Sequence, residues 1–226
     1  MEIVFVLHSP KVPENVGAAC RAIKTMGFSE LRIVASDAHL QKPARILAHG
    51  AGDILDNCSA FDGLGEAVAD CELVAATSAK PRLQFRELLG PAELRDTLRQ
   101  QQGAVGRVAL VFGCEESGLS NADLAHCHVL TSIPLATSFP SLNLGQAVML
   151  YAWELSRIPA ESPESGLPAS GQLEALRQKL GELLPALSFE PDSTLHRWAL
   201  EKVNRASAKD IGFLHTLVAK ILKKPP

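Results

Sequence analysis

The feature that most constrains the fold of this chain is a series of short apolar, β-branched runs in its first 133 residues, with segments of helical character between them. Such an alternation predicts an α/β protein whose sheet is mostly parallel and buried on both faces. The expected strands are 3–7, 31–35, 73–76, 108–112 and 129–133. The expected helices are 15–26, 43–48, 63–69 and 92–100.

The first expected helix is defined by its apolar spacing. Apolar residues recur at i, i+3, i+7 and i+10 and form one buried stripe, made of Val16, Ala19, Ile23 and Met26. Gly27 ends the helix. Asn15 is expected to cap its start, because a short amide side chain can accept a hydrogen bond from the first free amides.

The chain changes character after residue 158. Residues 159–170 contain three prolines and show no hydrophobic period, which indicates a linker. Three helices follow, around leucines at helical spacing, around 195–200, and after a capping-box-like start at Ser207. The stripes of these helices are interpreted as a core, and they consist of Leu173, Leu176, Leu180, Leu183 and Leu187, then Leu195, Trp198 and Leu200, then Ile211, Leu214, Leu217, Val218 and Ile221. We therefore expect an α/β domain over 1–158, a linker over 159–170 and an all-α extension over 171–226.

Size and charge exclude several classes of protein. The chain has 226 residues, 46% of them hydrophobic, and a net charge of −3, which argues against a protein that simply coats nucleic acid. No apolar run reaches the roughly 20 residues of a membrane span. The opening residues are interpreted as a strand rather than a signal peptide, and five scattered cysteines favour a reducing cytoplasm. From Arg197 onward, seven Lys or Arg face two acidic residues, which indicates either a solvated surface or one that faces RNA.

A polar cluster at 140–148 leads directly into an apolar helix. Ser141 and Asn143 are both residue types that cap helices, and Gly145 costs roughly 1 kcal/mol of helix propensity relative to Ala. A simple cap needs only one of these side chains. The excess indicates close approach of something else, either a ligand or another backbone.

Two more polar clusters follow expected strands, where α/β proteins bind their ligands. Near the first helix, Arg21 is expected to project away from the apolar stripe, as an anion or phosphate contact. After the fourth strand, the loop from Gly113 to Gly118 is expected to leave backbone amides and carbonyls free. Residues 77–82 form a further polar segment after the third strand.

Several common sites are absent from the sequence. The first strand is not followed by a dinucleotide-type glycine pattern, and no Walker phosphate loop is present. His126, Cys127 and His128 are adjacent on an expected strand, so their side chains alternate between faces and cannot all ligate one metal ion. We expect no metal site, and no sequence context supports a Ser-His-Asp triad.

Taken in order, three of these motifs resemble those of a known superfamily. They are Asn15-x-Gly17-x-x-x-Arg21, Leu110-Val-Phe-Gly-x-Glu115-x-x-Gly118-Leu119 and Ser141-Leu142-Asn143-Leu144. They resemble the motifs of the SpoU (TrmH-like) branch of the SPOUT methyltransferases, and most closely those of its TrmJ/LasT-type group. The resemblance covers nearly the whole chain, including Thr77-Ser78-Ala79 and the helical C-terminal extension.

This resemblance implies a fold and an activity. Members of the branch have a SPOUT-type parallel sheet with a trefoil knot, act as homodimers, bind S-adenosyl-L-methionine in the knot and methylate a ribose 2′-hydroxyl of RNA. The implied substrate is tRNA, with rRNA next. The implied cofactor contacts are Thr77, Ser78, Ala79, Gly113, Ile133, Pro140, Ser141 and Leu142. The implied catalytic or architectural polar residues are Arg21, Ser141, Asn15, Glu115 and Asn143.

Two residues within this resemblance, Arg21 and Cys114, bear most directly on the chemistry. A guanidinium stays protonated in proteins, so we interpret Arg21 as a clamp for the phosphate and a stabiliser of alkoxide charge rather than a base. In the family this Arg lies at the dimer interface. Cys114 stands where sequences of the TrmJ/LasT-type group usually carry Arg. This departure leaves open an RNA-binding homologue with weak or no methyltransferase activity.

Overall fold

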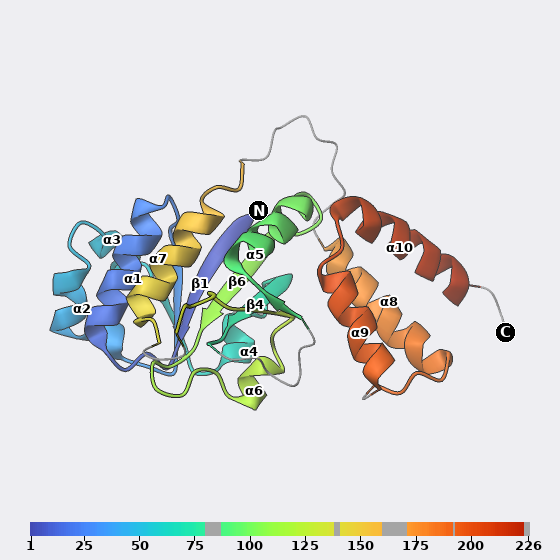
Figure 1. Ribbon diagram of the computed structural model, residues 1–226, viewed down its shortest axis with the longest axis horizontal. Helices are drawn as coiled ribbons and strands as arrows, with labels where there is room; N and C mark the ends of the chain where they lie inside the picture. Colours follow the sequence, from blue (N-terminus) through green and yellow to red (C-terminus); the bar gives the residue numbers. More distant parts are fainter. Residues whose placement is uncertain (80–86, 138–140, 160–170, 192, 224–226) are drawn as a thin grey trace.

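The computed structural model describes residues 1–79, 87–137, 141–159, 171–191 and 193–223 (Figure 1). Within these residues the chain forms a seven-stranded sheet in the order β3-β2-β1-β6-β4-β7-β5, with every neighbouring pair parallel. The strands are β1 (Glu2–His8), β2 (Glu30–Val34), β3 (Ser59–Phe61), β4 (Leu73–Thr77), β5 (Leu88–Leu89), β6 (Arg107–Phe112) and β7 (Val129–Thr131). The helices are α1 (Pro13–Thr25), η1 (Ala38–Leu40), α2 (Lys42–Leu47), α3 (Gly52–Asp56), α4 (Leu64–Ala67), α5 (Pro91–Gln100), α6 (Asn121–Leu124), α7 (Leu144–Leu155), α8 (Gln172–Ala186), α9 (Thr194–Asn204) and α10 (Ala208–Leu222).

The predicted strands and helices of the α/β part are all present, to within two residues at each end. The sequence patterns missed β3, β5, α3 and α6, because elements of two to five residues are too short to show a period. The expected strand at 129–133 ends at Thr131, so Ile133 lies beyond it. Gly27 has a φ of 85° and follows the last turn of α1, as predicted.

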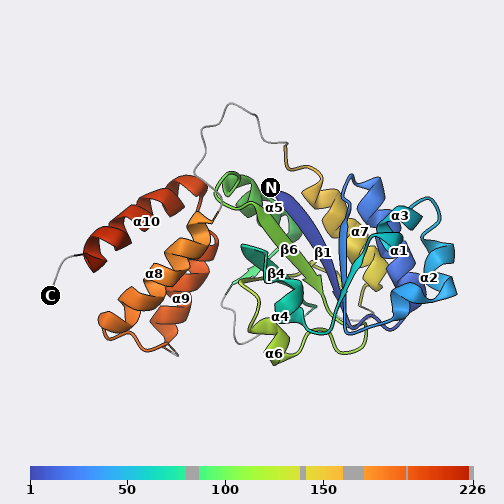
Figure 2. The same cartoon turned by 180° about the vertical axis from the view of Figure 1, so that it is seen from behind.

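The sheet is buried on both faces. Along β1, Phe5 and Leu7 point into one apolar cluster, which includes residues of α1, α5 and α7. Val4 and Val6 point into a second cluster with residues of α4 and α6. The first face is in front in Figure 1 and the second in Figure 2. Burial on both faces explains why the strands read as continuous apolar runs.

Helix α1 packs very closely against α2 at Gly17. A Cβ atom at this position would lie 2.3 Å from the Ala44 carbonyl oxygen and 2.8 Å from Leu47 Cβ. No real Cβ atom tolerates such a distance to a backbone oxygen. The glycine of the first motif is therefore explained by helix packing beside the site.

We expect Gly17→Ala to destabilise the fold by about 1–3 kcal/mol, because overpacking outweighs the roughly 1 kcal/mol gained in helix propensity. Gly181 is a matched control, since it lies in α8 and a Cβ atom added there would meet nothing within 4 Å. There Ala is expected to stabilise the protein by about 0.5–1 kcal/mol. Urea unfolding of both variants measures these opposite signs. Equal effects at the two positions would contradict the packing argument.

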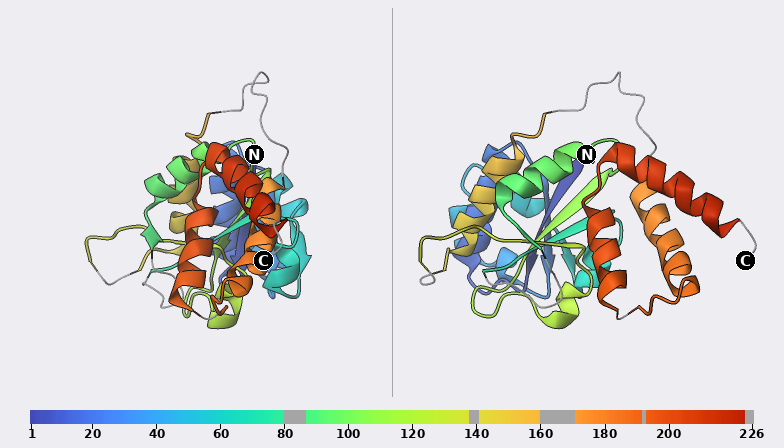
Figure 3. Two further views of the ribbon diagram at one scale, coloured as in Figure 1. Left: turned by 90° about the vertical axis from the view of Figure 1, so that its right-hand side faces the viewer. Right: turned by 45° about the vertical axis from the view of Figure 1, so that its right-hand side comes forward.

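The three C-terminal helices pack together beside the sheet, with α8 against α9 and α10 (Figure 3). The expected core positions are partly correct: Leu173, Leu176, Leu180, Leu183, Ile211 and Val218 are buried. Others were wrongly expected in the core and are exposed, namely Leu187, Leu195, Trp198, Leu217 and Ile221. A bundle of three short helices has too small an interior to bury every residue of the three predicted stripes. Ser207 caps α10 through the Asp210 amide, as predicted.

Polar contacts join these helices to the α/β part at the amino-terminal ends of the strands. Arg177 donates to the Glu72 carbonyl at 2.6 Å and to Asn204 Oδ1 at 2.7 Å. Asn204 in turn donates to the carbonyl of His128 at 3.2 Å, and Gln101 donates to the carbonyl of Asn204 at 2.7 Å. The junction therefore depends on directional hydrogen bonds as well as apolar burial. Of the linker expected at 159–170, all but Pro159 lies outside the described residues.

Candidate functional site

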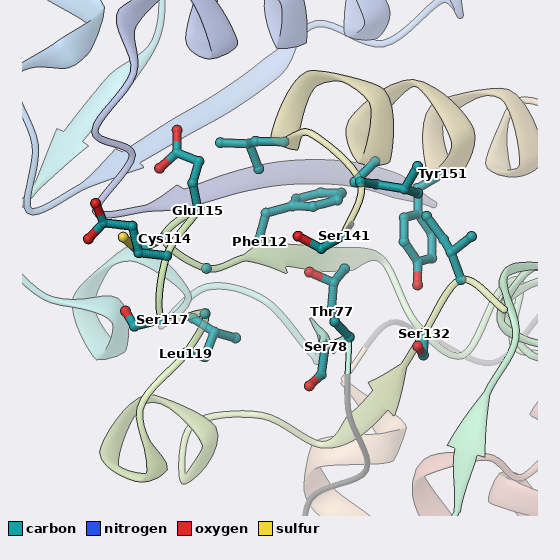
Figure 4. A pocket seen from close by; sticks show the side chains of 18 of the residues that line it. Thr77, Ser78, Phe112, Cys114, Glu115, Ser117, Leu119, Ser132, Ser141 and Tyr151 are labelled. Atoms are coloured by element: carbon teal, nitrogen blue, oxygen red, sulfur yellow. The ribbon is translucent and has the colours of Figure 1, made fainter. Parts of the chain in front are cut away.

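A pocket of about 740 Å³ opens at the carboxyl ends of the central strands β4, β6 and β7 (Figure 4). Ligands of open α/β sheets bind at this edge, where the connections that follow neighbouring strands lead to opposite sides of the sheet. The pocket is lined by residues 77–79, 112–119, 124, 132–133, 135, 141–142, 144, 147 and 151. Segments more than sixty residues apart in the sequence thus form one cavity.

The lining combines hydroxyl-bearing and apolar side chains. Hydroxyl groups of Thr77, Ser78, Ser132 and Ser141 line it, as Figure 4 shows. Phe112, Leu119 and Tyr151 provide apolar surface. Such a lining can hold a flat, apolar ring while hydroxyls and backbone groups bind its polar edges.

The loop after β6 is shaped by two glycines. A Cβ atom on Gly113 would lie 2.4 Å from the carbonyl carbon of Gly118, so the loop folds back directly on this residue. Gly118 has a φ of 68°, and its N–H donates to the Cys114 carbonyl at 2.8 Å. Those two backbone groups were expected to be free and instead bind each other. The turn fixes the direction of Glu115 between them.

Glu115 binds the start of α1. Its carboxylate accepts hydrogen bonds from the Lys11 N–H at 3.0 Å, the Val12 N–H at 3.3 Å and the Asn15 side-chain amide at 2.9 Å. Helix α1 has no capping side chain of its own. A carboxylate from a loop a hundred residues away therefore occupies the anion-binding end of the helix.

Asn15 does not cap α1, contrary to the sequence-based expectation. The N-cap residue is Val12, Pro13 is the first residue of α1, and Asn15 is buried two residues further on, within the first turn. Its side-chain oxygen accepts a hydrogen bond from Asn143 Nδ2 at 2.7 Å. The sequence-based expectation was wrong because the group that binds the start of α1, the Glu115 carboxylate, comes from a loop that is distant in the sequence.

Asn143 is the N-cap of α7. Its side-chain oxygen accepts from the Gly145 N–H at 2.9 Å, while Gln146 accepts from the Asn143 N–H at 3.2 Å. Glu115, Asn15 and Asn143 thus form a continuous hydrogen-bonded chain between the three motifs. The structure brings these three predicted polar residues together beside the pocket.

The environment of Glu115 favours its charged form. Partial burial raises the pKa of this carboxyl group, but the hydrogen bonds from Lys11, Asn15 and Val12 outweigh burial and hold the pKa below its ordinary value. A carboxylate with a low pKa and three donors is a weak proton acceptor near neutral pH. The geometry therefore fits an architectural role for Glu115 better than a base.

The close approach expected at Gly145 is to another part of the chain. A Cβ atom there would lie 2.8 Å from Ala18 Cβ on α1 and 3.3 Å from Asn143 Oδ1. The two alternatives were a ligand and another backbone. The structure places α1 there, with the Ala18 side chain nearest and the Asn15 carbonyl oxygen at 3.7 Å. Gly145 lets α7 lie against α1, which places Ser141 at the pocket.

Arg21 is exposed on α1 and is not among the residues that line the pocket. It lies away from the apolar stripe, as the spacing predicted, but six residues beyond Asn15 along the helix. The pocket within one chain therefore does not contain the side chain expected to clamp the substrate. The role of Arg21 stays a prediction.

Seven of the eight expected cofactor contacts line the pocket, namely Thr77, Ser78, Ala79, Gly113, Ile133, Ser141 and Leu142. Pro140 lies outside the described residues, as do 80–82 of the polar segment after β4. Thr77 donates from its hydroxyl to the Val111 carbonyl at 3.0 Å, and the Ser78 N–H donates to the Thr131 carbonyl at 2.9 Å. These bonds hold β4, β6 and β7 together at the pocket. Their role toward a cofactor stays a prediction.

Sequence reasoning missed the buried floor of the pocket. Tyr151, the single tyrosine of the chain, is 1% exposed, and its hydroxyl lies 2.9 Å from Thr131 Oγ1. Thr131 donates to the Leu89 carbonyl, so Tyr151 is the donor to Thr131. This relay links α7, β7 and β5 under the pocket. A lone tyrosine on an otherwise apolar helix face is the signal that was available.

Two other sequence features have structural explanations. His128 accepts a hydrogen bond from the Val74 N–H at 2.9 Å, and burial lowers its pKa to about 3. Cys114 is buried beside Glu115, which places a small apolar side chain at this point of the pocket wall.

In the described ranges, no group of three or more potential ligands is arranged to hold a metal ion. No helix of these ranges is long and apolar enough to cross a membrane.

The fold and pocket define an α/β protein with a ligand site at the carboxyl edge of a parallel sheet. Residues 2–153 match the SpoU rRNA methylase family, and residues 170–225 match the C-terminal domain of the tRNA/rRNA methyltransferase LasT. The chain belongs to the SpoU methylase family.

Relatives support this assignment along nearly the full length. The chain is 42% identical over 224 residues to the uncharacterized tRNA/rRNA methyltransferase LasT of Escherichia coli K12, covering 99% of this chain and 98% of that protein. It is 37% identical over 195 residues to the tRNA (cytidine/uridine-2′-O-)-methyltransferase TrmJ of Pectobacterium atrosepticum, covering 83% and 80%. The crystal structure of TrmJ from Z. mobilis ZM4 superposes with a TM-score of 0.65 at 28% identity, covering 99% and 100%.

Proposed function

We propose that this protein transfers a methyl group from S-adenosyl-L-methionine to a ribose 2′-hydroxyl of tRNA. The observation that carries the proposal is the hydrogen-bonded chain Glu115–Asn15–Asn143, which joins all three SpoU motifs at the rim of one pocket. Relatives named tRNA 2′-O-methyltransferases, which match over most of their length, support the reaction and the substrate class.

The residues present fit the cofactor. A cavity of about 740 Å³ has room for it, and its mixture of hydroxyl and apolar groups suits an adenosine with a polar amino-acid tail. Residues 77–79, 113, 133 and 140–142 are proposed to hold it. When bound, S-adenosyl-L-methionine supplies an activated methyl group, so the protein needs to contribute position and exclusion of water rather than a metal.

In this proposal the polar residues have different roles. Glu115, Asn15 and Asn143 hold the loop after β6 and the start of α7 against α1. This arrangement keeps Ser141 at the pocket, where its hydroxyl lies beside the reacting ribose. Arg21 clamps the adjacent phosphate through its planar fork and stabilises negative charge on the ribose oxygen. The low pKa of Glu115 makes that carboxylate a weak base, so the proton leaves to water or to a group other than Glu115.

We also propose that the active protein is a homodimer in which the partner subunit completes each site. Arg21 lies outside the pocket of its own chain, on the exposed surface of the packed helices α1 and α7. On α7 this surface carries two large apolar side chains, Leu150 and Trp153, which are 41% and 50% exposed. A second copy packed on this surface would bury them and bring an Arg21 toward each pocket.

Leu150→Arg tests this interface. We expect the variant to be a monomer at concentrations where the wild type is a dimer, because a desolvated charge opposes association. Leu187→Arg is the matched control, since Leu187 is 53% exposed but lies at the end of α8 in the C-terminal helices. Multi-angle light scattering gives the mass of each. A dimeric Leu150→Arg variant contradicts the proposed interface.

The trefoil knot, the division into 1–158, 159–170 and 171–226, and a cytoplasmic location also belong to this proposal. The knot is supported by the SpoU membership of residues 2–153. The division is supported by the separate family match at 170–225. The location is supported by five cysteines that are all free thiols.

The decisive experiment is transfer of labelled methyl groups from S-adenosyl-L-methionine to total tRNA and, separately, to rRNA, followed by mapping of the modified nucleotide. We expect label in tRNA at a ribose 2′-oxygen. Label in rRNA alone would support an rRNA methyltransferase instead. Binding of both cofactor and tRNA without transfer would support an RNA-binding homologue, the alternative favoured by the small, buried Cys114 beside Glu115.

A further inference from the structure

Helix α9 exposes two large apolar side chains that its core does not use. Leu195 is 45% exposed and Trp198 is 44% exposed, although tryptophan and leucine are usually buried. They lie three residues apart and therefore on one side of the helix. Lys202 follows Trp198 one turn further on, on the same side.

Contacts at the other end of α9 locate Trp198 relative to the pocket. Asn204 binds the carbonyl of His128, just before β7, and Lys202 pairs with Glu87, just before β5. Glu87 precedes Leu88, the residue that pairs with Leu130. Helix α9 therefore runs antiparallel to β7, and following it backwards from Asn204 leads in the direction of β7. Figure 1 shows the same course, with α9 starting at the level of α6.

Trp198 is therefore expected at the level of the carboxyl end of β7, where the chain enters the pocket. Six residues of helix from Asn204 to Trp198 span about 9 Å. The three residues of β7 span about 10 Å in the same direction. The next residue, Ser132, lines the pocket. An exposed aromatic ring thus lies at the level of the pocket, on the side of the C-terminal helices.

The charge of this unit identifies the kind of partner. Residues 171–226 contain nine Lys or Arg and six Asp or Glu, whereas residues 1–170 contain 13 and 19. The C-terminal helices are therefore the cationic part of an otherwise acidic protein. Arg197, the neighbour of Trp198, is exposed. An exposed aromatic ring beside an exposed arginine, on the cationic unit and at the level of the pocket, fits a polyanion that carries flat apolar rings.

We propose that Trp198 is a stacking platform for an unpaired nucleobase of the RNA substrate, flanking the nucleotide that enters the pocket. Recognition of single-stranded RNA commonly combines stacking on an aromatic side chain with cations on the backbone. Arg197, which is exposed beside Trp198, binds an adjacent phosphate. The proposal rests on the proposed RNA methyltransferase function and adds to it a residue for substrate choice, because base-paired RNA offers no free ring.

The test compares Trp198→Ala with Phe213→Ala in the full-length protein, with total tRNA as the probe. Phe213 is a matched control, since it is 68% exposed on α10 of the same helical unit. Stacking contributes about 1–3 kcal/mol per base, so we expect the Kd for tRNA to rise roughly 5- to 150-fold in Trp198→Ala. We expect less than a twofold change in Phe213→Ala, and partial recovery in Trp198→Phe. Calorimetry with S-adenosyl-L-methionine should give the wild-type Kd in all three, which shows that the pocket is intact.

A second measurement reports stacking directly. The part of the tryptophan emission that is lost in Trp198→Phe belongs to Trp198. We expect tRNA and a single-stranded oligonucleotide to quench this part, and a fully paired RNA duplex to leave it unchanged. If Trp198→Ala binds tRNA with wild-type affinity, the stacking platform is overturned. The same holds if the duplex quenches the Trp198 emission as strongly as the single-stranded oligonucleotide does. In both cases the methyltransferase proposal stands. Failure of the wild-type protein to bind or methylate any RNA overturns both.

Discussion

Arg21→Ala is expected to lower the rate of methyl transfer by about 100-fold or more, the effect of removing one charged donor from a developing oxyanion. The cofactor pocket of the same chain should be unaffected, because Arg21 is exposed and does not line it. We therefore expect an unchanged Kd for S-adenosyl-L-methionine together with a large fall in the single-turnover rate on tRNA. This combination separates a role in the reaction from a role in folding.

Two further variants sharpen this prediction. Arg21→Lys keeps the charge but loses the planar fork, and we expect it to stay at least tenfold below the wild type. Lys24→Ala removes a cation three residues further along α1, where its ammonium pairs with Asp53 at 2.6 Å, and we expect nearly normal transfer. Near-normal rates in Arg21→Lys would rule out a bidentate clamp. A similar fall in the transfer rate of Lys24→Ala would mean that the loss reflects surface charge in general rather than Arg21 itself.

Glu115→Ala is expected to lower both stability and activity. The substitution leaves the Lys11 and Val12 amides and the Asn15 side chain without their acceptor at the start of α1. The lost cap and the orphaned donors together correspond to about 1–3 kcal/mol of unfolding free energy. Because Asn15 also holds Asn143, we expect the start of α7 to loosen and cofactor affinity to fall with it. Urea unfolding and calorimetry measure the two effects.

Glu115→Gln distinguishes architecture from base catalysis. It keeps an acceptor oxygen for Asn15, so an architectural role predicts partial activity, whereas a base role predicts none. Glu116→Gln is the control, because Glu116 is exposed and adjacent, and its carboxylate pairs with the Lys11 ammonium at 2.5 Å. Complete loss in Glu115→Gln with normal stability would contradict the architectural role.

The pKa of Glu115 fixes the sign of the pH dependence. A carboxyl group whose pKa is lower in the folded than in the unfolded protein stabilises the fold above its unfolded pKa, near 4.5. This contribution is lost as the pH falls through the lower, folded value. The stability difference between wild type and Glu115→Gln should therefore be constant from about pH 5 to 8 and shrink below about pH 4. A difference that grows in acid would contradict the low pKa.

The sequence predicted the elements of the fold more reliably than their ends and partners. Apolar runs located every long strand, and the stripe of Val16, Ala19 and Ile23 identified the buried side of α1. It did not identify the cap of this helix, because Glu115 comes from a loop that the local sequence does not contain. Nor did it foresee that Trp198 is exposed, since a period marks an apolar side without showing what covers it.

By itself, the sequence determined an α/β fold, three polar motifs at strand and helix ends, and a cationic helical extension, because periodicity and composition are local properties. Only the tertiary structure decided which polar groups meet. Asn15 and Asn143 are 128 residues apart and hydrogen-bond because β1 and β6 are neighbours in the sheet and α7 packs on α1. The structure also separated Arg21 from the pocket of its own chain, since a helix can present only one side to its core. Strand order and helix packing, which bring distant residues together, assembled the site.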